Sequence, residues 1–359
     1  MPDLPGHLGA LTLRESALLV LALSIAALLV LAVAFALYAL VLRVRNERRE
    51  RRWQRLEAAW EEPLLAALAD PQRIPQVREV VEEDYRLHFV RFVLAYARRV
   101  RGEERATLRE LVAPYLDPIA ERVWSKHQEI RTRAVQTLGT LGLPHYAGEV
   151  VTALDDPSPL VAMVAARALS SDEYPEYAEA VLRRLRRFDT WSRSFLASML
   201  AGIGNSGAPA IRATLTDRNE PAWVRAVAAQ ALGTLKDFEA GDPAAAVVET
   251  EEDPELLSAA LRLLALAGSP EHAPVVRARC ASPDPTVRSA ALRALGTLGD
   301  EEDANRLLGA MADPSPWVAI HAARGLLAAG AHQLLSDLAA SDHPRAMLAR
   351  QILMEEGEA

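Results

Sequence analysis

The chain of 359 residues has one cysteine, Cys280, and aromatic residues make up only 5% of it. A single cysteine excludes an internal disulfide and a zinc site built from several cysteines, and it fits a reducing compartment. Apolar residues nevertheless make up 50% of the chain, so alanine and leucine must supply the core. This composition is typical of helical bundles and solenoids rather than of β-rich proteins.

Charge is absent from residues 16–42, a run of 27 residues. A helix of roughly 20 apolar residues spans a bilayer core, whereas the apolar core of a cleavable signal peptide covers roughly 7–15 residues. The run therefore predicts a retained transmembrane helix, with a buried core helix as the alternative. Small residues one turn apart, such as Ala22 and Ala26, can seat a second membrane helix.

Arginine dominates the segment that follows this run. Residues 43–55 hold seven arginines and two glutamates, whereas residues 1–15 hold one arginine and two acidic residues. Because the positive flank stays on the cytoplasmic side, we expect residues 1–15 outside and the rest of the chain in the cytoplasm. The segment is either a stop-transfer flank alone or also a contact with anionic lipid, with Trp53 and Trp60 as interface anchors. The predicted membrane-interface residues are Arg43, Arg45, Arg48, Arg49, Arg51, Arg52, Trp53 and Arg55.

The remainder of the chain is acidic. Residues 56–359 hold 32 basic and 44 acidic residues, a net charge of −12. Binding to nucleic acid normally needs a basic face that neutralises phosphates. The charge balance therefore argues against DNA or RNA as a partner.

From residue 130 onward the sequence repeats at intervals of 31 or 32 residues. In its best copy, DPTVRSAALRALGTLG (Asp284–Gly299), apolar side chains recur every four residues at Val287, Ala291 and Leu295. The opening Asp-Pro can start a helix and the final glycine can end it. Val287 defines a reference position, and the equivalent reference positions are Ile130, Val161, Ser192, Val224, Leu256 and Val318. Leucine follows eight residues after each of them, and seven aligned copies predict a repeat array.

This pattern resembles HEAT repeats, in the short variety described as bilin-lyase-like and known from membrane-anchored bacterial proteins. The resemblance covers roughly residues 130–352 and is clearest at Asp284–Gly299 and Val224–Leu235. It implies antiparallel helix pairs stacked into a curved right-handed solenoid, about seven to nine pairs in all, whose second helices line the concave surface. It does not imply one activity, because adaptors, lyases and hydroxylases share such repeats.

The predicted fold class is all-α, with an N-terminal transmembrane helix followed by the solenoid. The predicted segments are an extracytoplasmic N-terminus at 1–15, the transmembrane helix at 16–42, a basic juxtamembrane helix at 43–60, a helical cap region at 61–128 and the solenoid with its C-terminal cap at 129–359. Expected helices include Val77–Val100 and Pro118–His127 in the cap region. Second helices of the repeats are expected at 145–155, 175–187, 207–215, 243–250, 270–281, 301–311 and 331–340.

Motifs typical of cofactor, metal or catalytic sites are either missing or lack the secondary structure that they need. Gly202, Gly204 and Gly207 spell G-x-G-x-x-G, but a dinucleotide site needs a strand before it, and a repeat helix precedes it here. The sequence has no H-E-x-x-H motif and no His-Glu pair of the kind that HEAT-type di-iron hydroxylases repeat. Cys280 has no evident histidine partner. We therefore expect no catalytic residue, cofactor site or metal site.

Two groups of residues are candidates for a partner-binding surface. Arg183, Arg184 and Arg187 share a side of one second helix. They form either a positive binding site or a solvated face whose charge is balanced by nearby acidic residues, namely Asp172, Glu173, Glu176 and Glu179. Tryptophan stands one residue before the reference position in three repeats. These residues, Trp191, Trp223 and Trp317, either bind a partner or wedge between repeats.

The sequence thus predicts a non-catalytic membrane-anchored scaffold whose cytoplasmic solenoid binds an integral membrane protein at the cytoplasmic (inner) membrane. A subunit role in a complex such as an envelope polysaccharide glycosyltransferase follows from the resemblance alone. Two alternatives remain open: a sensor that binds an anionic small molecule through the Arg183 cluster, and a lyase-like enzyme.

Overall fold

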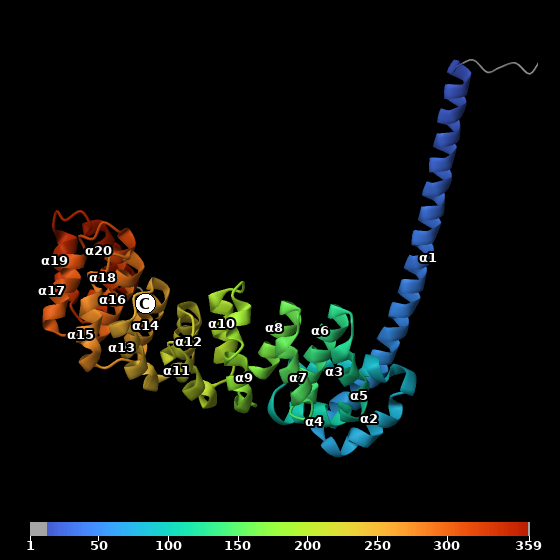
Figure 1. The fold of residues 1–359 in the computed structure, drawn as a ribbon, viewed down its shortest axis with the longest axis horizontal. Helices are drawn as coiled ribbons and strands as arrows, with labels where there is room; N and C mark the ends of the chain where they lie inside the picture. The colour runs from blue at the N-terminus through green and yellow to red at the C-terminus, as the bar shows by residue number, and fades with distance from the viewer. Residues whose placement is uncertain (1–12, 358–359) are drawn as a thin grey trace, which may run out of the picture. The chain divides into compact units, whose positions relative to one another are not determined.

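The computed structural model describes residues 13–357, with side chains from residue 21 onward. The predicted N-terminal segment therefore lies almost wholly outside the described residues. Throughout residues 13–357 the chain forms helices joined by short turns, without a strand (Figure 1). The chain divides into two compact units, Met1–Leu111 and Val112–Ala359.

The first unit begins with one helix of 57 residues, α1 (Leu13–Ala69). Its apolar part is long and apolar enough to cross a membrane, and no residue of the most apolar stretch is buried. Leu29 and Phe35, for example, are 65% and 71% exposed. A core helix would cover such side chains, so α1 is a long, exposed apolar helix near the N-terminus.

The end of α1 packs on α2 (Ile74–Val80) and α3 (Arg86–Ala97). The next helix is α4 (Gly102–Val112), and we call α2, α3 and α4 the cap helices. Trp60 is 1% exposed, and its ring meets Phe89 edge-on at 5.2 Å. The expectation that Trp60 lies at a membrane interface is therefore wrong, because the side chain belongs to the core of this unit.

The predicted helix Val77–Val100 is in fact two helices. Three consecutive acidic residues, Glu82 to Asp84, lie between α2 and α3. Carboxylates are unfavourable at a helix C-terminus and favourable at an N-terminus, so the chain ends α2 before them and restarts after them. Pro118–His127 is likewise shorter than expected, with α5 (Asp117–Ala120) followed by a 3₁₀ turn, Glu121–Trp124.

The second unit stacks helix pairs in two layers (Figure 1). Its first helices are α6 (Gln128–Thr137), α8 (Pro159–Leu169), α10 (Arg193–Ala201), α12 (Ala222–Leu235), α14 (Pro254–Ala267), α16 (Pro285–Leu298) and α18 (Pro316–Ala328). Its second helices are α7 (Ala147–Thr152), α9 (Ala178–Leu182), α11 (Ala208–Thr216), α13 (Gly241–Thr250), α15 (Ala273–Arg279), α17 (Glu301–Ala310) and α19 (His332–Ala340), and α20 (Ala346–Gly357) follows them. From α10 to α18 each first helix packs on the next, and α9, α11, α13 and α15 pack in the same way.

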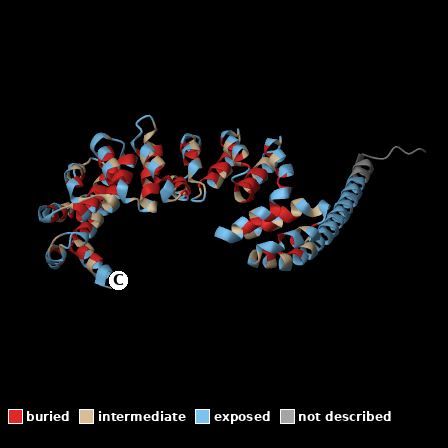
Figure 2. Ribbon diagram, turned by 90° about the horizontal axis from the view of Figure 1, so that it is seen from below, coloured by how far each residue is buried: buried red, intermediate tan, exposed pale blue. Residues whose placement is uncertain are grey.

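The core of this unit lies where the helices face one another, as the buried residues in Figure 2 show. Val287, Ala291 and Leu295 of α16 are at most 1% exposed, as the four-residue recurrence predicts. Small residues let neighbouring first helices approach closely. A Cβ added at Gly296 would lie 2.5 Å from the backbone of Gly325 in the next repeat.

One second helix differs from its prediction. Residues 175–187 form two 3₁₀ turns, Pro175–Tyr177 and Leu185–Phe188, around a short α9. In a 3₁₀ turn, residues three apart lie on one side, and this turn buries both Leu185 and Phe188 completely. The burial of these two side chains explains why the α-helix does not continue through the arginine-rich segment.

Candidate functional site

Ion pairs join successive repeats in the second unit. In three repeats an arginine directly follows the reference position and binds a carboxylate in the next repeat. The pairs are Arg131–Asp156 at 2.7 Å, Arg225–Glu251 at 2.8 Å and Arg288–Asp313 at 2.9 Å. Both side chains of each pair are largely buried, so these charges hold the array together and are not free for a ligand.

Hydrogen bonds from arginine lower the pKa values of two carboxyl groups at these contacts. The Arg288 guanidinium beside Asp313 lowers the pKa of that carboxyl group, and Arg277 lowers the pKa of Asp303 in the same way. Arg277 donates from Nη2 to Asp303 at 2.7 Å and to Asp300 at 2.7 Å. Asp303 and Asp313 therefore have structural partners and are not poised as general acids at neutral pH.

Two members of the predicted Arg183 cluster are bound to the preceding repeat. Arg184 donates from Nη2 to Asp155 Oδ2 at 2.6 Å, and Arg187 donates to the carbonyl oxygen of Asp156 at 2.7 Å. The side chain of Arg183 remains 67% exposed and lies 3.6 Å from Glu179. The cluster is thus offset mainly by Asp155, which was not among the acidic residues expected to balance it.

The three aligned tryptophans have different surroundings. Trp191 is half-buried and stacks on Phe195 with ring centroids 5.5 Å apart. Trp223 is also half-buried, with the Arg193 guanidinium 4.1 Å from its ring centroid. Trp317 is 57% exposed. Equivalent positions in the repeat therefore give two packed side chains and one large exposed ring, and their binding role stays a prediction.

The predicted membrane-interface residues lie along the exposed part of α1 and its junction with the cap helices. Arg43 pairs with Glu47 one turn later, and both side chains are open to solvent. Trp53 is half-buried, and its ring stacks on His88 with centroids 3.8 Å apart. Trp53 therefore contributes to the packing of the first unit. Of the arginines before it, Arg52 donates a hydrogen bond to the Tyr85 hydroxyl and Arg49 lies over the Trp53 ring, so these two are also engaged at this junction.

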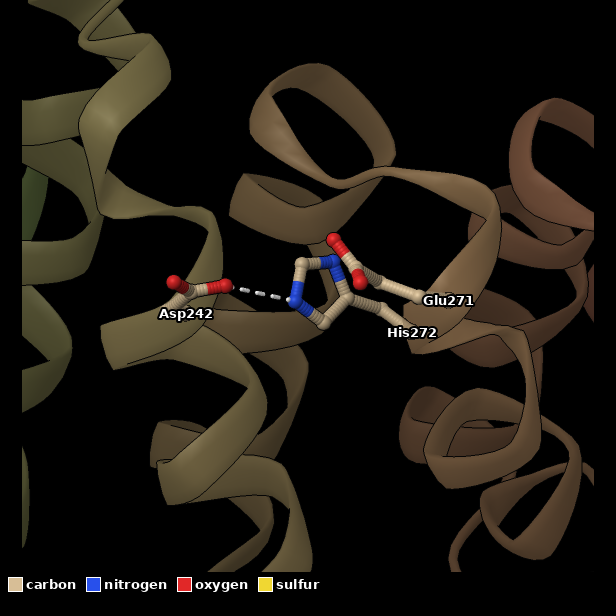
Figure 3. A group of neighbouring side chains, drawn as sticks. All are labelled: Asp242, Glu271 and His272. Atoms are coloured by element: carbon tan, nitrogen blue, oxygen red, sulfur yellow. Dashed lines mark hydrogen bonds and ion pairs between the residues drawn. The ribbon is translucent and has the colours of Figure 1, made fainter.

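Asp242, Glu271 and His272 form a group that resembles a metal site in composition (Figure 3). His272 lies 2.9 Å from Asp242 Oδ1 through Nε2, and its Nδ1 accepts the Ser269 N–H at 3.0 Å. Because Nδ1 accepts, Nε2 carries the proton and donates to Asp242. Both ring nitrogens are therefore used, and a metal ion would have to displace two hydrogen bonds. The group is therefore better explained as a hydrogen-bonded contact between two repeats than as a metal centre.

The surroundings of Cys280 and of the glycine motif indicate structural roles for both. Burial raises the pKa of the Cys280 thiol to about 12, and its Sγ lies 3.6 Å from the carbonyl oxygen of Val276. A protonated thiol is a poor nucleophile. Gly204, three residues after the end of α10, has a φ of 76°. The G-x-G-x-x-G segment is therefore the turn that follows a helix rather than a strand-to-helix phosphate loop.

A row of arginines on the first helices is not among the binding residues predicted from the sequence. Arg262, Arg293 and Arg324 each stand six residues after a reference position, and all three are exposed. The apolar periodicity that defines the repeats does not mark this position. Its signal is the recurrence of one charged residue at a fixed offset in three consecutive repeats. We call these three residues the arginine row.

Comparison with known proteins supports the fold. Residues 241–328, from α13 to α18, match the family model of HEAT repeats. The second unit is a HEAT-like α-solenoid. The comparison with curated proteins gave no match.

Two solved structures are similar to the chain at a coarse level. A mutant of Kap121p has 15% identity and a TM-score of 0.41, and the match covers 75% of this chain and 35% of that one. The chain thus spans about a third of the length of that protein. An engineered protein has 16% identity and a TM-score of 0.38, and the match covers 84% of this chain and 95% of that one.

Proposed function

We propose that the protein is a non-catalytic, membrane-anchored scaffold. One observation carries the proposal: an exposed apolar helix, α1, lies in the same chain as a HEAT-like solenoid. HEAT solenoids generally mediate contacts between proteins. The anchor would hold such a contact surface next to the bilayer, where it meets other membrane proteins.

The surroundings of the charged side chains support a binding role over a catalytic one. Arg288, Arg184 and His272 use their polar atoms for contacts between repeats. Catalysis needs a nucleophile, acid or base with a suitable pKa and access to substrate. Cys280, the nucleophile that a lyase-like activity would use, is held as a thiol by burial. The exposed groups of the array are instead suited to surface recognition.

In this proposal α1 spans the cytoplasmic membrane, and the solenoid lies in the cytoplasm on the side of the arginines at 43–55. The partner is an integral membrane protein, and a subunit of an envelope polysaccharide glycosyltransferase is one such partner. The proposed contact residues include Trp317 and Arg183, whose side chains are exposed. Recognition would come from shape and charge rather than from a bound cofactor.

The test is affinity capture of the full chain from membranes in mild detergent, followed by identification of stoichiometric partners. A matched variant carries a leucine–alanine helix of equal length in place of residues 16–42. We expect both chains to capture the same membrane protein, because recognition lies in the solenoid. Capture by the natural chain alone would show that recognition lies in the membrane helix. If neither chain captures a stoichiometric protein, the scaffold proposal is refuted.

A further inference from the structure

The face of α18 that points to solvent carries a stripe of three different side chains. Trp317, His321 and Arg324 follow one another at intervals of four and three residues, which places them on one side of the helix. The Trp317 ring meets the His321 ring edge-on at 4.9 Å. Trp317 is 57% exposed, and the side chain of Arg324 is 56% exposed. Trp317 and Arg324 are therefore accessible, with the half-buried His321 between them.

The arginine row continues the stripe across two more repeats. α14 packs on α16 and α16 packs on α18, so residues at one offset in these helices lie in line. Arg262 and Arg293 are exposed, and neither forms an ion pair or hydrogen bond within the part of the chain that the structure describes. Neighbouring packed helices lie about 8–10 Å apart. The row therefore presents one guanidinium per repeat at roughly that interval.

The charge of the row reaches the neighbouring imidazole. Burial, and then Arg293, Arg324 and Arg262, lower the pKa of His321. Its Nδ1 is buried and has no hydrogen-bond partner. The charged groups that act on His321 are all arginines, although residues 56–359 as a whole carry a net charge of −12.

The C-terminal helix shows which chemistry the row accepts. Glu355 of α20 lies 3.5 Å from Arg324, with its own side chain 50% exposed. One end of the row is thus already in contact with a carboxylate from an acidic segment of the chain itself. Arg262 and Arg293 have no such contact.

We propose that the arginine row docks an extended acidic segment of a partner protein, with a carboxylate at about every third residue. This inference rests on the proposed scaffold function and specifies its partner. An extended or polyproline II chain rises about 3.1–3.4 Å per residue, so three residues cover about 9–10 Å, the interval between repeats. Trp317, on the same side of α18 as Arg324, would supply an apolar contact near this end of the row.

A designed peptide tests the spacing. The probe is fluorescently labelled Glu-Pro-Pro-Glu-Pro-Pro-Glu, which places three carboxylates on one side of a polyproline II helix. The control peptide has the same composition with its three glutamates adjacent. Binding to the full chain in neutral detergent micelles is measured by fluorescence anisotropy. We expect the spaced peptide to bind at least about fivefold more tightly, with an affinity that falls as salt rises.

Three variants test the residues. Arg293→Glu should weaken binding of the spaced peptide about tenfold, because repulsion replaces attraction at the central position. Arg167→Glu is the matched control, since Arg167 is exposed at the same offset but has Gln136 and Ser198 at the equivalent neighbouring positions. It should change the affinity less than twofold. Glu355→Gln should strengthen binding about two- to threefold, because it releases Arg324 from a competing carboxylate.

Histidine NMR gives an independent readout. A carboxylate docked on the row would offset the three arginines that face His321, including Arg324, which Glu355 also contacts. The pKa of His321 should therefore rise when the spaced peptide binds to the natural chain. Arg293→Glu should itself raise this pKa, because it removes one of the arginines that lower it, and adding the peptide to that variant should raise it little further.

Two results would overturn the inference. The first is equal binding of both peptides, or binding that Arg293→Glu does not weaken. The second is Arg293-dependent binding of phosphatidylglycerol vesicles without peptide binding, which would make the row a lipid contact. Affinity capture separates this failure from that of the scaffold: if Arg293→Glu captures the same stoichiometric partner as the natural chain, the scaffold stands and the row has no part in it.

Discussion

Lys236 has the only positive φ of a non-glycine residue within the described part of the chain, at 56°. It stands twelve residues after a reference position, where Gly204 and Gly330 have φ values of 76° and 73°. Its N–H bonds back to Leu232 and Gly233 at the end of α12. Three repeats thus have a left-handed residue at this position, whereas Gly268 and Gly299 at the same offset have φ values of −76° and −77°. A side chain in the left-handed conformation costs about 1–2 kcal/mol.

Replacing Lys236 by glycine should raise the free energy of unfolding by about 1 kcal/mol, because glycine enters the left-handed region without the Cβ clash. Thermal or urea unfolding monitored by circular dichroism measures the change. Lys236→Ala is the control and should give no gain, since alanine keeps the Cβ. An equal gain for both substitutions would show that loss of the lysine charge, and not the backbone, is responsible.

The Cys280 thiol should react slowly. Because burial raises its pKa to about 12, alkylation by iodoacetamide at pH 8 should be at least about tenfold slower than that of a free cysteine peptide, whose pKa is about 8.5. Mass spectrometry follows the modification. Rapid alkylation in the folded protein, or a bound chromophore lost with Cys280→Ala, would favour the lyase-like alternative.

Among the helices, spacing between repeats depends on small residues at one position. Gly233 and Gly296 both stand nine residues after a reference position. A Cβ at Gly296 would overlap the backbone of Gly325 at 2.5 Å, whereas a Cβ at Gly233 would meet nothing within 4 Å. The same residue type at the same offset thus has different roles in α12 and α16.

The same substitution should therefore have opposite effects at the two positions. Gly296→Ala should destabilise the protein by about 1–3 kcal/mol, because α16 and α18 must move apart. Gly233→Ala should stabilise it by about 0.5–1 kcal/mol through helix propensity alone. Unfolding midpoints of the two variants decide the matter, and destabilisation by both would show that the two interfaces are equally tight.

The helices differ in how far the sequence alone predicts them. The first helices were predictable, because Val287, Ala291 and Leu295 recur with the period that burial requires. The end of α2 and the 3₁₀ turn at Leu185–Phe188 were not, since tertiary burial and local charge override the apolar pattern there. The binding role of the Arg183 cluster was also undecided, because only the fold brings Asp155 to Arg184. The arginine row was visible in the sequence, but only to a comparison of polar positions between repeats.

At the scale of the whole array, stability is approximately a sum of repeat and interface contributions. Ionised carboxylates such as Asp303 and Asp313 contribute to several interfaces. Arginine lowers their pKa values in the folded state, so their contribution is present above the unfolded pKa of about 3.9 and is lost as the pH falls through the folded values. The array should therefore unfold cooperatively at low pH.

The thermal midpoint should be nearly constant from pH 7 to about pH 5 and should fall below about pH 4. Asp313→Asn should cost about 2 kcal/mol at pH 7, the loss of a charged hydrogen bond, and the difference from the natural chain should vanish in acid. Asp337→Asn, an exposed change on α19, is the control and should cost less than about 0.5 kcal/mol. A difference for Asp313→Asn that persists at pH 2 would contradict the ion-pair origin.

Because α1 is continuous, its length fixes how the cap helices are rotated relative to its apolar part. The helix runs without interruption from its apolar part to Trp60 in the core of the first unit, and each helical residue adds about 100° and 1.5 Å. Two residues inserted between 43 and 52 would turn the cap helices by about 200° relative to the apolar segment, whereas seven would restore their facing to within about 20° and add about 10 Å. In the proposed membrane-anchored protein, the number of residues between the apolar segment and Trp60 would therefore set the direction in which the cap helices face.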